Sequence, residues 1–120
     1  MAKKVQWNCR GFRANFNELS LLMSDLEPIA FCLQELILSD THVFNNRHYN
    51  LLTSVPLMNS NNRPQGGAGI LVCKNIPHCA VPLNTKLQAL ACRLSTSQPL
   101  TLCSVYLPHP AHGRTPTSYR

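Results

Sequence analysis

The feature that most constrains the fold is a strand–helix–strand pattern close to the N-terminus. Residues 4–9 alternate between polar and apolar side chains, as a half-buried strand does. A helix should follow, because Asn15 and Glu18 have the spacing of a capping box, and Pro28 should end it. Residues 29–33 form a continuous apolar run, which is typical of a strand covered on both faces. Together these segments predict a βαβ unit with parallel strands and a right-handed crossover.

Parallel strands bring their carboxyl ends to the same edge of a sheet. Asn8 and Glu35 stand at the ends of the two predicted strands, so their side chains should emerge side by side. Ligand sites in sheets of this kind commonly lie at that edge. The sequence therefore predicts a polar site that contains one amide and one carboxylate.

The remainder of the chain up to Leu107 is rich in short apolar segments that predict strands. These segments lie at residues 49–52, 70–73, 79–81, 87–94 and 100–107. Residues 59–65 read as a polar loop. Gly66, Gly67 and Gly69 do not open a helix, so they are not a phosphate-binding loop. We expect them to allow close backbone packing or a bulge.

The composition favours one soluble domain. The chain has 120 residues, and 44% of them are hydrophobic, which suffices for a core. No apolar stretch approaches the roughly 20 residues that a membrane helix needs. The basic start is not followed by a signal-peptide core. We therefore expect an intracellular protein with no membrane partner.

The cysteines and the charge agree with that location. The six cysteines form no CxxC pair, and most lie in or beside apolar runs, which favours reduced structural thiols. The net charge is +6, with eleven basic residues and five acidic ones. A basic surface suits a polyanionic partner. The basic residues are scattered, however, so ordinary solubility explains them as well.

Three segments, in this order and each at the end of a predicted strand, resemble the endonuclease/exonuclease/phosphatase superfamily. They are Val5-Gln-Trp-Asn-Cys-Arg-Gly11, Phe31-Cys-Leu-Gln-Glu35 and Cys103-Ser-Val-Tyr-Leu-Pro108. The closer likeness is to the endonuclease domain of non-LTR retrotransposons of the jockey type. Supporting segments lie at residues 13–19, 66–72, 76–78 and 81–85, so the likeness covers nearly all of residues 4–108.

The resemblance implies an α/β fold, the N-terminal half of a four-layer α/β sandwich with a mixed sheet and a βαβ start. Residues 1–108 would be a partial endonuclease/exonuclease/phosphatase domain, and residues 109–120 a divergent tail that we expect to be disordered. The chain would hold one sheet with its helix and leave the inner apolar face uncovered. Such a face favours self-association.

The resemblance also implies roles for three residues. Glu35 matches the family's metal-binding glutamate, which holds Mg²⁺ or Mn²⁺. Asn8 matches an asparagine that supports the metal and the catalytic hydrogen bonds, and Tyr106 a tyrosine that contacts the scissile phosphate. On the residues alone, a solvated glutamate, a turn asparagine and a core tyrosine remain alternatives.

The implied activity is Mg²⁺-dependent nicking of nuclear DNA at a target site, used to prime reverse transcription. The family completes its site in its second half, with an Asp-x-Asn segment and an Asp–His pair. Here no Asp or Glu occurs after Asp40. We therefore expect a truncated or frameshifted copy with weak or no catalysis.

Two other functions remain open. The first is a binding module that keeps DNA affinity without chemistry, through Arg10, Arg13, Arg63 and Lys74. The second, much less favoured, is a zinc protein that uses Cys73, His78 and Cys79, or His109 and His112. These cysteines lack the regular spacing of common zinc sites.

Overall fold

The computed structural model describes residues 3–39, 43–54, 57–58, 61 and 63–107. The tail at residues 109–120 lies outside the described residues. The elements, in chain order, are β1 (Lys4–Asn8), α1 (Phe16–Leu26), β2 (Ala30–Gln34), β3 (Tyr49–Thr53), β4 (Leu57–Met58), β5 (Pro64–Gln65), β6 (Ala68–Cys73), β7 (His78–Val81), β8 (Gln88–Leu94) and β9 (Leu100–Tyr106). The described part contains no helix long and apolar enough to cross a membrane.

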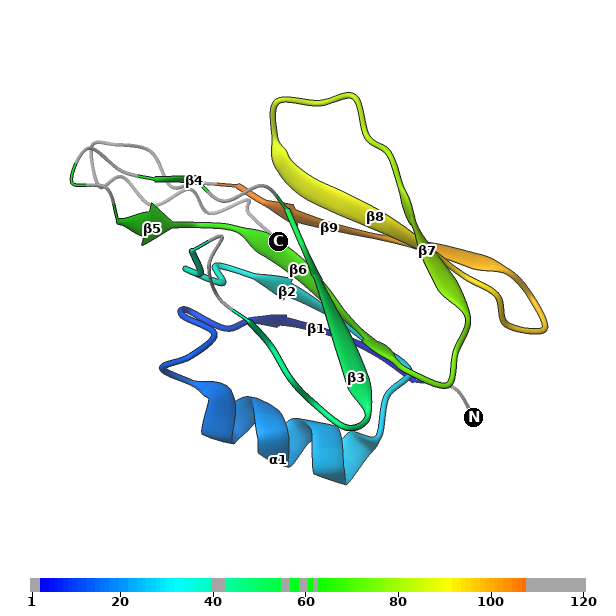
Figure 1. Cartoon of the computed structure of the whole chain (residues 1–120). Helices are drawn as coiled ribbons and strands as arrows, with labels where there is room; N and C mark the ends of the chain where they lie inside the picture. The colour runs from blue at the N-terminus through cyan, green and yellow to red at the C-terminus, as the bar shows by residue number, and fades with distance from the viewer. Residues whose placement is uncertain (1–2, 40–42, 55–56, 59–60, 62, 108–120) are drawn as a thin grey trace, which may run out of the picture.

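The predicted βαβ unit is confirmed. β1 and β2 are parallel neighbours, with Lys4 opposite Ala30 and Asn8 opposite Gln34. α1 connects them and lies against one face of the sheet (Figure 1).

The capping box is wrong, although Asn15 does precede the helix. The Asn15 side chain makes no cap hydrogen bond. Its Nδ2 instead donates to the carbonyl oxygens of Cys9 at 2.7 Å and Arg10 at 3.2 Å. An Asn side chain that binds nearby backbone carbonyls competes with capping. Asn15 thus fixes the turn that follows β1.

The strands form mixed and antiparallel sheets. The four-stranded sheet has the order β1-β2-β6-β3, and β6 runs antiparallel to both of its neighbours. The three-stranded sheet β7-β8-β9 is antiparallel throughout. β4 pairs with β5, and β5 lies within residues 59–65, which were expected to be a loop. The close packing expected of the glycines is found at Gly69, where an added Cβ would lie 2.7 Å from Leu36 Cδ1.

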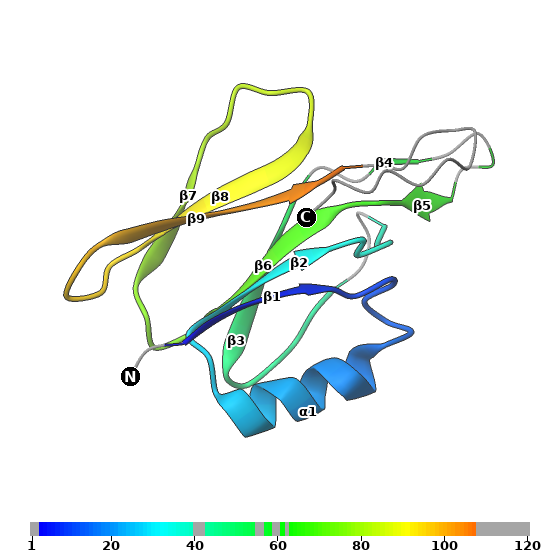
Figure 2. The ribbon, with the colours of Figure 1, turned by 180° about the vertical axis from the view of Figure 1, so that it is seen from behind.

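The two larger sheets lie face to face, so the chain has a helix layer and two sheet layers (Figures 1 and 2). The core between α1 and the four-stranded sheet includes Leu19, Met23, Phe31, Leu33 and Leu71. The core between the sheets includes Ala30, Ile70, Val72, Cys92 and Leu94.

This arrangement corrects the expectation of one sheet with an uncovered inner face. β7–β9 form a second sheet, and their alternate side chains cover the face of the four-stranded sheet that α1 leaves free. The uncovered face was our reason to expect self-association, and the second sheet removes that reason. Self-association remains an untested prediction.

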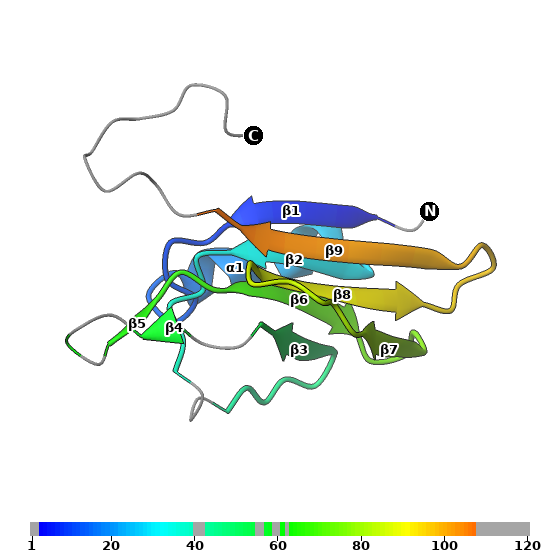
Figure 3. The same ribbon diagram turned by 90° about the horizontal axis from the view of Figure 1, so that it is seen from above.

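Ser104 joins the two sheets through buried hydrogen bonds. Seen from above, β9 lies over β2 and runs nearly along it (Figure 3). Ser104 is 1% exposed; its Oγ donates to the Leu33 carbonyl oxygen at 2.7 Å and accepts from Gln34 Nε2 at 3.1 Å. Because a side chain links the sheets without any strand pairing, the register of β9 over β2 depends on it.

Ser104→Ala should lower the free energy of unfolding by about 1–3 kcal/mol, because it removes both bonds and leaves buried polar groups without them. Urea unfolding measures the change. Ser97→Ala, at an exposed position in the turn between β8 and β9, is the control and should stay within about 0.5 kcal/mol of the parent. Equal midpoints for the two variants would contradict the bridging role.

Candidate active site

Asn8 and Glu35 lie next to each other at one edge of the four-stranded sheet. Asn8 stands opposite Gln34 in the parallel pair, and Glu35 follows Gln34 directly. Backbone bonds continue past the strand ends, from Cys9 N–H to the Gln34 oxygen at 3.0 Å and from Gly11 N–H to the Glu35 oxygen at 2.8 Å. The chain therefore holds both residues at a fixed edge rather than on free loops.

Gly66 and Gly67 lie beside the segment that follows β2 at this edge. Ile37 N–H donates to the Gly66 oxygen at 2.8 Å, and Leu36 N–H to the Gly67 oxygen at 3.3 Å. Gly67 N–H donates in turn to Gln88 Oε1 at 2.8 Å. Two glycines thus connect the segment after β2 with the start of β8 in the second sheet.

Tyr106 reaches the same place from β9. It stands opposite Gln88. Its ring lies so close to Gly66 that an added Cβ would be 2.6 Å from Tyr106 Cε2. Burial raises the pKa of Tyr106, and the charge of Glu35 raises it further, so the phenol stays protonated near neutral pH. The structure therefore packs Tyr106 against Gly66 and brings it within electrostatic reach of Glu35.

The backbone around this edge is held in unusual conformations. Positive φ angles occur at Arg10 (50°), Glu35 (56°) and Ile37 (52°), where L-residues are strained. Gly11, Gly66 and Gly67 have positive φ angles too. Strain of this kind concentrates at functional sites, where the surrounding structure imposes it.

Cys9, which follows Asn8, is buried at this edge as a neutral thiol. Burial raises its pKa to about 11, and Glu35 adds a smaller increase. The protonated Sγ donates to the Gln34 carbonyl oxygen at 3.2 Å. Cys9 therefore adds no negative charge that would compete with Glu35 at neutral pH.

The basic residues divide between the two edges. Arg10 and Arg13 are exposed in the turn between β1 and α1, beside Asn8. Arg63 is exposed just before β5, which leads directly into Gly66. Lys74 is misplaced in the predicted DNA surface. It follows Cys73, whose N–H donates to the Ile29 oxygen at 2.9 Å, so it lies at the start of β2, about 20 Å from Glu35 along the strand.

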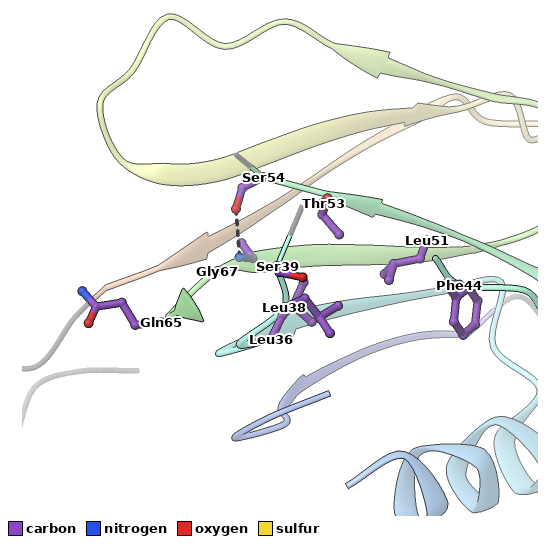
Figure 4. Close-up of a pocket in the computed structure, with 10 residues that line it drawn as sticks. Leu36, Leu38, Ser39, Phe44, Leu51, Thr53, Ser54, Gln65 and Gly67 are labelled. Carbon is purple, nitrogen blue, oxygen red and sulfur yellow. Dashed lines mark hydrogen bonds between the residues drawn. The ribbon is translucent and has the colours of Figure 1, made fainter. Parts of the chain in front are cut away.

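A neutral cavity of about 240 Å³ lies beside the site (Figure 4). Leu36 and Gly67 line it, and Ser54 closes one side by accepting a 3.1 Å bond from Ala68 N–H. The remaining lining residues are Leu38, Ser39, Phe44, Leu51, Thr53, Gln65 and Ala68. None of these side chains is charged, so the cavity adds no carboxylate to the site.

Two side chains at this edge carry oxygen atoms of the kind that a hydrated Mg²⁺ ion binds. Mg²⁺ keeps several waters and takes one or two carboxylates with other oxygen ligands. The edge offers the Glu35 carboxylate and the amide oxygen of Asn8, which also accepts from Arg10 N–H at 3.2 Å. In the described ranges, no group of three His, Cys, Asp or Glu side chains that could hold a metal ion comes together, and this finding applies to magnesium as well as to zinc. His109 and His112 lie outside those ranges.

Two residues of the edge were not predicted as site residues. Gln88 holds Gly67, and its Nε2 is buried without a partner among the described residues, so one donor stays unsatisfied beside Tyr106. Gly66 admits the Tyr106 ring. The signal in the sequence was a glutamine at the start of an apolar strand, and it was too weak to identify a site residue.

A comparison with models of known protein families gives no match, and a search among curated proteins gives none either. The family resemblance therefore depends on the quoted segments alone.

Proposed function

We propose that this chain carries the first part of a Mg²⁺-dependent DNA endonuclease site and has the fold of the N-terminal half of a four-layer α/β sandwich. The proposal is supported by the neighbouring positions of Asn8 and Glu35 at two strand ends, and by the packing of Tyr106 on Gly66, whose carbonyl oxygen accepts a bond from Ile37 N–H two residues after Glu35. Only five acidic residues occur in the chain, so a carboxylate at that edge is a rare group. Nicking of nuclear target DNA is the activity that the resemblance adds.

Each residue has a task that its position supports. The Glu35 carboxylate would hold Mg²⁺ (or Mn²⁺) with help from the Asn8 amide. The bound ion would polarise the phosphodiester and stabilise the leaving oxygen. Tyr106, as a protonated phenol, can donate a hydrogen bond to a phosphate oxygen. Arg10 and Arg13 would bind neighbouring phosphates and set the position of the duplex.

A second candidate is a DNA-binding remnant without catalysis. It is favoured by the absence of any Asp or Glu after Asp40, because general-base catalysis by a His–Asp pair then has no downstream carboxylate. Both candidates require DNA at the Glu35 edge. They differ only in whether a phosphodiester bond is broken.

The test is nicking of supercoiled plasmid by the full chain with Mg²⁺, together with duplex binding followed by fluorescence anisotropy. We expect binding that weakens as salt rises, with a log–log slope of about 2–3 for contacts by Arg10, Arg13 and Arg63. Any nicking should disappear in Glu35→Gln. No nicking with normal binding supports the remnant.

A matched pair of charge variants locates the DNA. Arg10→Gln combined with Arg13→Gln should lower the salt slope by about 2, since each phosphate contact contributes close to one unit. Lys74→Gln, at the opposite edge, should leave the slope unchanged. The proposal fails if the chain does not bind DNA, or if the Lys74 variant loses as much as the arginine pair.

A further inference from the structure

A second cavity lies at the opposite edge of the four-stranded sheet. Its volume is about 620 Å³, within the range of small-molecule sites, which is about 300–1,000 Å³. The C-terminal half of α1, the loop that enters β3 and the end of β6 surround it. In Figure 1 that loop turns directly above the C-terminal end of α1.

Glu27 lines this cavity, and its backbone conformation and its charge are both unfavourable for a residue at the end of a helix. It ends α1 in the left-handed conformation, with φ 46°, where glycine is the usual residue. It also places a carboxylate at the negative end of the helix dipole, where cations are favoured, and α1 has no basic residue in its last turn. In the described part of the chain, the other non-glycine residues of positive φ are Arg10, Glu35 and Ile37, and they lie at the candidate active site. Local rules are broken mainly where function requires it.

The lining of the cavity has a polar side and an apolar side. Among the described residues, Glu27 is the one carboxylate of the lining and is exposed, and the lining contains no Lys or Arg, in a chain with a net charge of +6. The Tyr49 hydroxyl donates to the Pro28 oxygen at 2.6 Å, and Cys73 Sγ donates to Asn75 Oδ1 at 2.8 Å, so both use their hydrogens within the protein. Burial, and then Cys73 and Glu27, raise the pKa of Tyr49, which keeps the hydroxyl protonated. Met23, Ile29 and Ile76 supply apolar surface.

We propose that this cavity binds a small organic amine. The ammonium group lies against Glu27 and the carbonyl end of α1, and an apolar body lies on Met23, Tyr49 and Ile76. Such a ligand supplies the positive charge that the helix end lacks. A metal ion suits the cavity less well, because Glu27 is its one carboxylate and apolar side chains occupy much of the wall.

Isothermal titration of the full chain with phenethylamine tests the proposal. His48 also lines the cavity. We expect saturable binding of phenethylamine, and weak or no binding of 2-phenylethanol, which has a similar shape and no charge. Glu27→Gln keeps the size of the side chain and should weaken phenethylamine binding about two- to fivefold, the value of one exposed ion pair.

Two further variants test whether phenethylamine binds in this cavity. Asp25→Asn removes a carboxylate at an exposed position of α1 outside the cavity lining, and it should bind phenethylamine like the parent. Ser24→Trp, at an exposed position in the lining, should block the ligand while the core stays intact. Absence of binding by the parent overturns the proposal, as does equal affinity in Glu27→Gln or equal affinity for the alcohol.

Discussion

Gly66→Ala should lower the free energy of unfolding by about 3 kcal/mol, the sum of a left-handed alanine and an overpacked contact. Gly66 has φ 62°, and an added Cβ would lie 2.5 Å from Gln88 Oε1 and 2.6 Å from Tyr106 Cε2. Neither neighbour can give way freely. Gln88 Oε1 is bound to Gly67 N–H, and the Tyr106 ring belongs to a paired strand. Urea unfolding followed by circular dichroism measures the loss.

Gly67→Ala is the matched control, because it separates strain from contact. Gly67 has φ 96°, but the nearest atom to an added Cβ is 3.6 Å away. Its alanine variant should therefore lose only the conformational part, about 1–2 kcal/mol. Equal losses at the two positions would mean that Tyr106 and Gln88 do not press on Gly66, and the proposed arrangement of the site would be wrong.

The first part of the fold could be predicted because its signals are local. Pro28 stops a helix wherever it lies, and an uninterrupted apolar run at residues 29–33 needs cover on both faces. The structure supplies that cover, with α1 on one face and the second sheet on the other. Parallel pairing then places Asn8 beside Glu35 without further information.

The second sheet could not be predicted, because strand pairing across long stretches of sequence leaves no local pattern. Residues 78–106 read as strands, but nothing in them states whether they extend the first sheet or form another. Ser104 decides part of this in the structure, through bonds to residues about 70 positions earlier. The prediction of a capping box at Asn15 was wrong for a related reason. The Asn15 side chain could bind either the helix start or the preceding turn, and in the structure it binds the turn.

The edge of the sheet at which Lys74 lies could not be predicted either. In the sequence it follows an apolar strand, as Arg10 and Glu35 do. β6 runs antiparallel to β2, so its end lies at the edge opposite to Glu35. Strand direction, which the sequence does not state, therefore decides whether a basic residue can share a surface with the carboxylate.

Glu35→Gly should make the chain more stable and remove its response to Mg²⁺. Glu35 has φ 56°, so glycine relieves a left-handed L-residue, and the free energy of unfolding should rise by about 1 kcal/mol in the absence of metal. If Glu35 is the metal ligand, the parent should gain stability as Mg²⁺ is added, by RT ln(1 + [L]/Kd), and the variant should gain none. Unfolding curves at several Mg²⁺ concentrations measure both effects.

Two companion variants divide the effects of Glu35. Glu35→Gln keeps the strained backbone and removes the charge, so it should lose the Mg²⁺ response without the gain in stability. Ile37→Gly, at φ 52° on the same segment, should gain stability and keep the response. A Mg²⁺ response that survives in Glu35→Gln would show that the ion binds elsewhere. The backbone strain at Glu35 would then be unrelated to metal binding, and the proposed nuclease site would lose its central ligand.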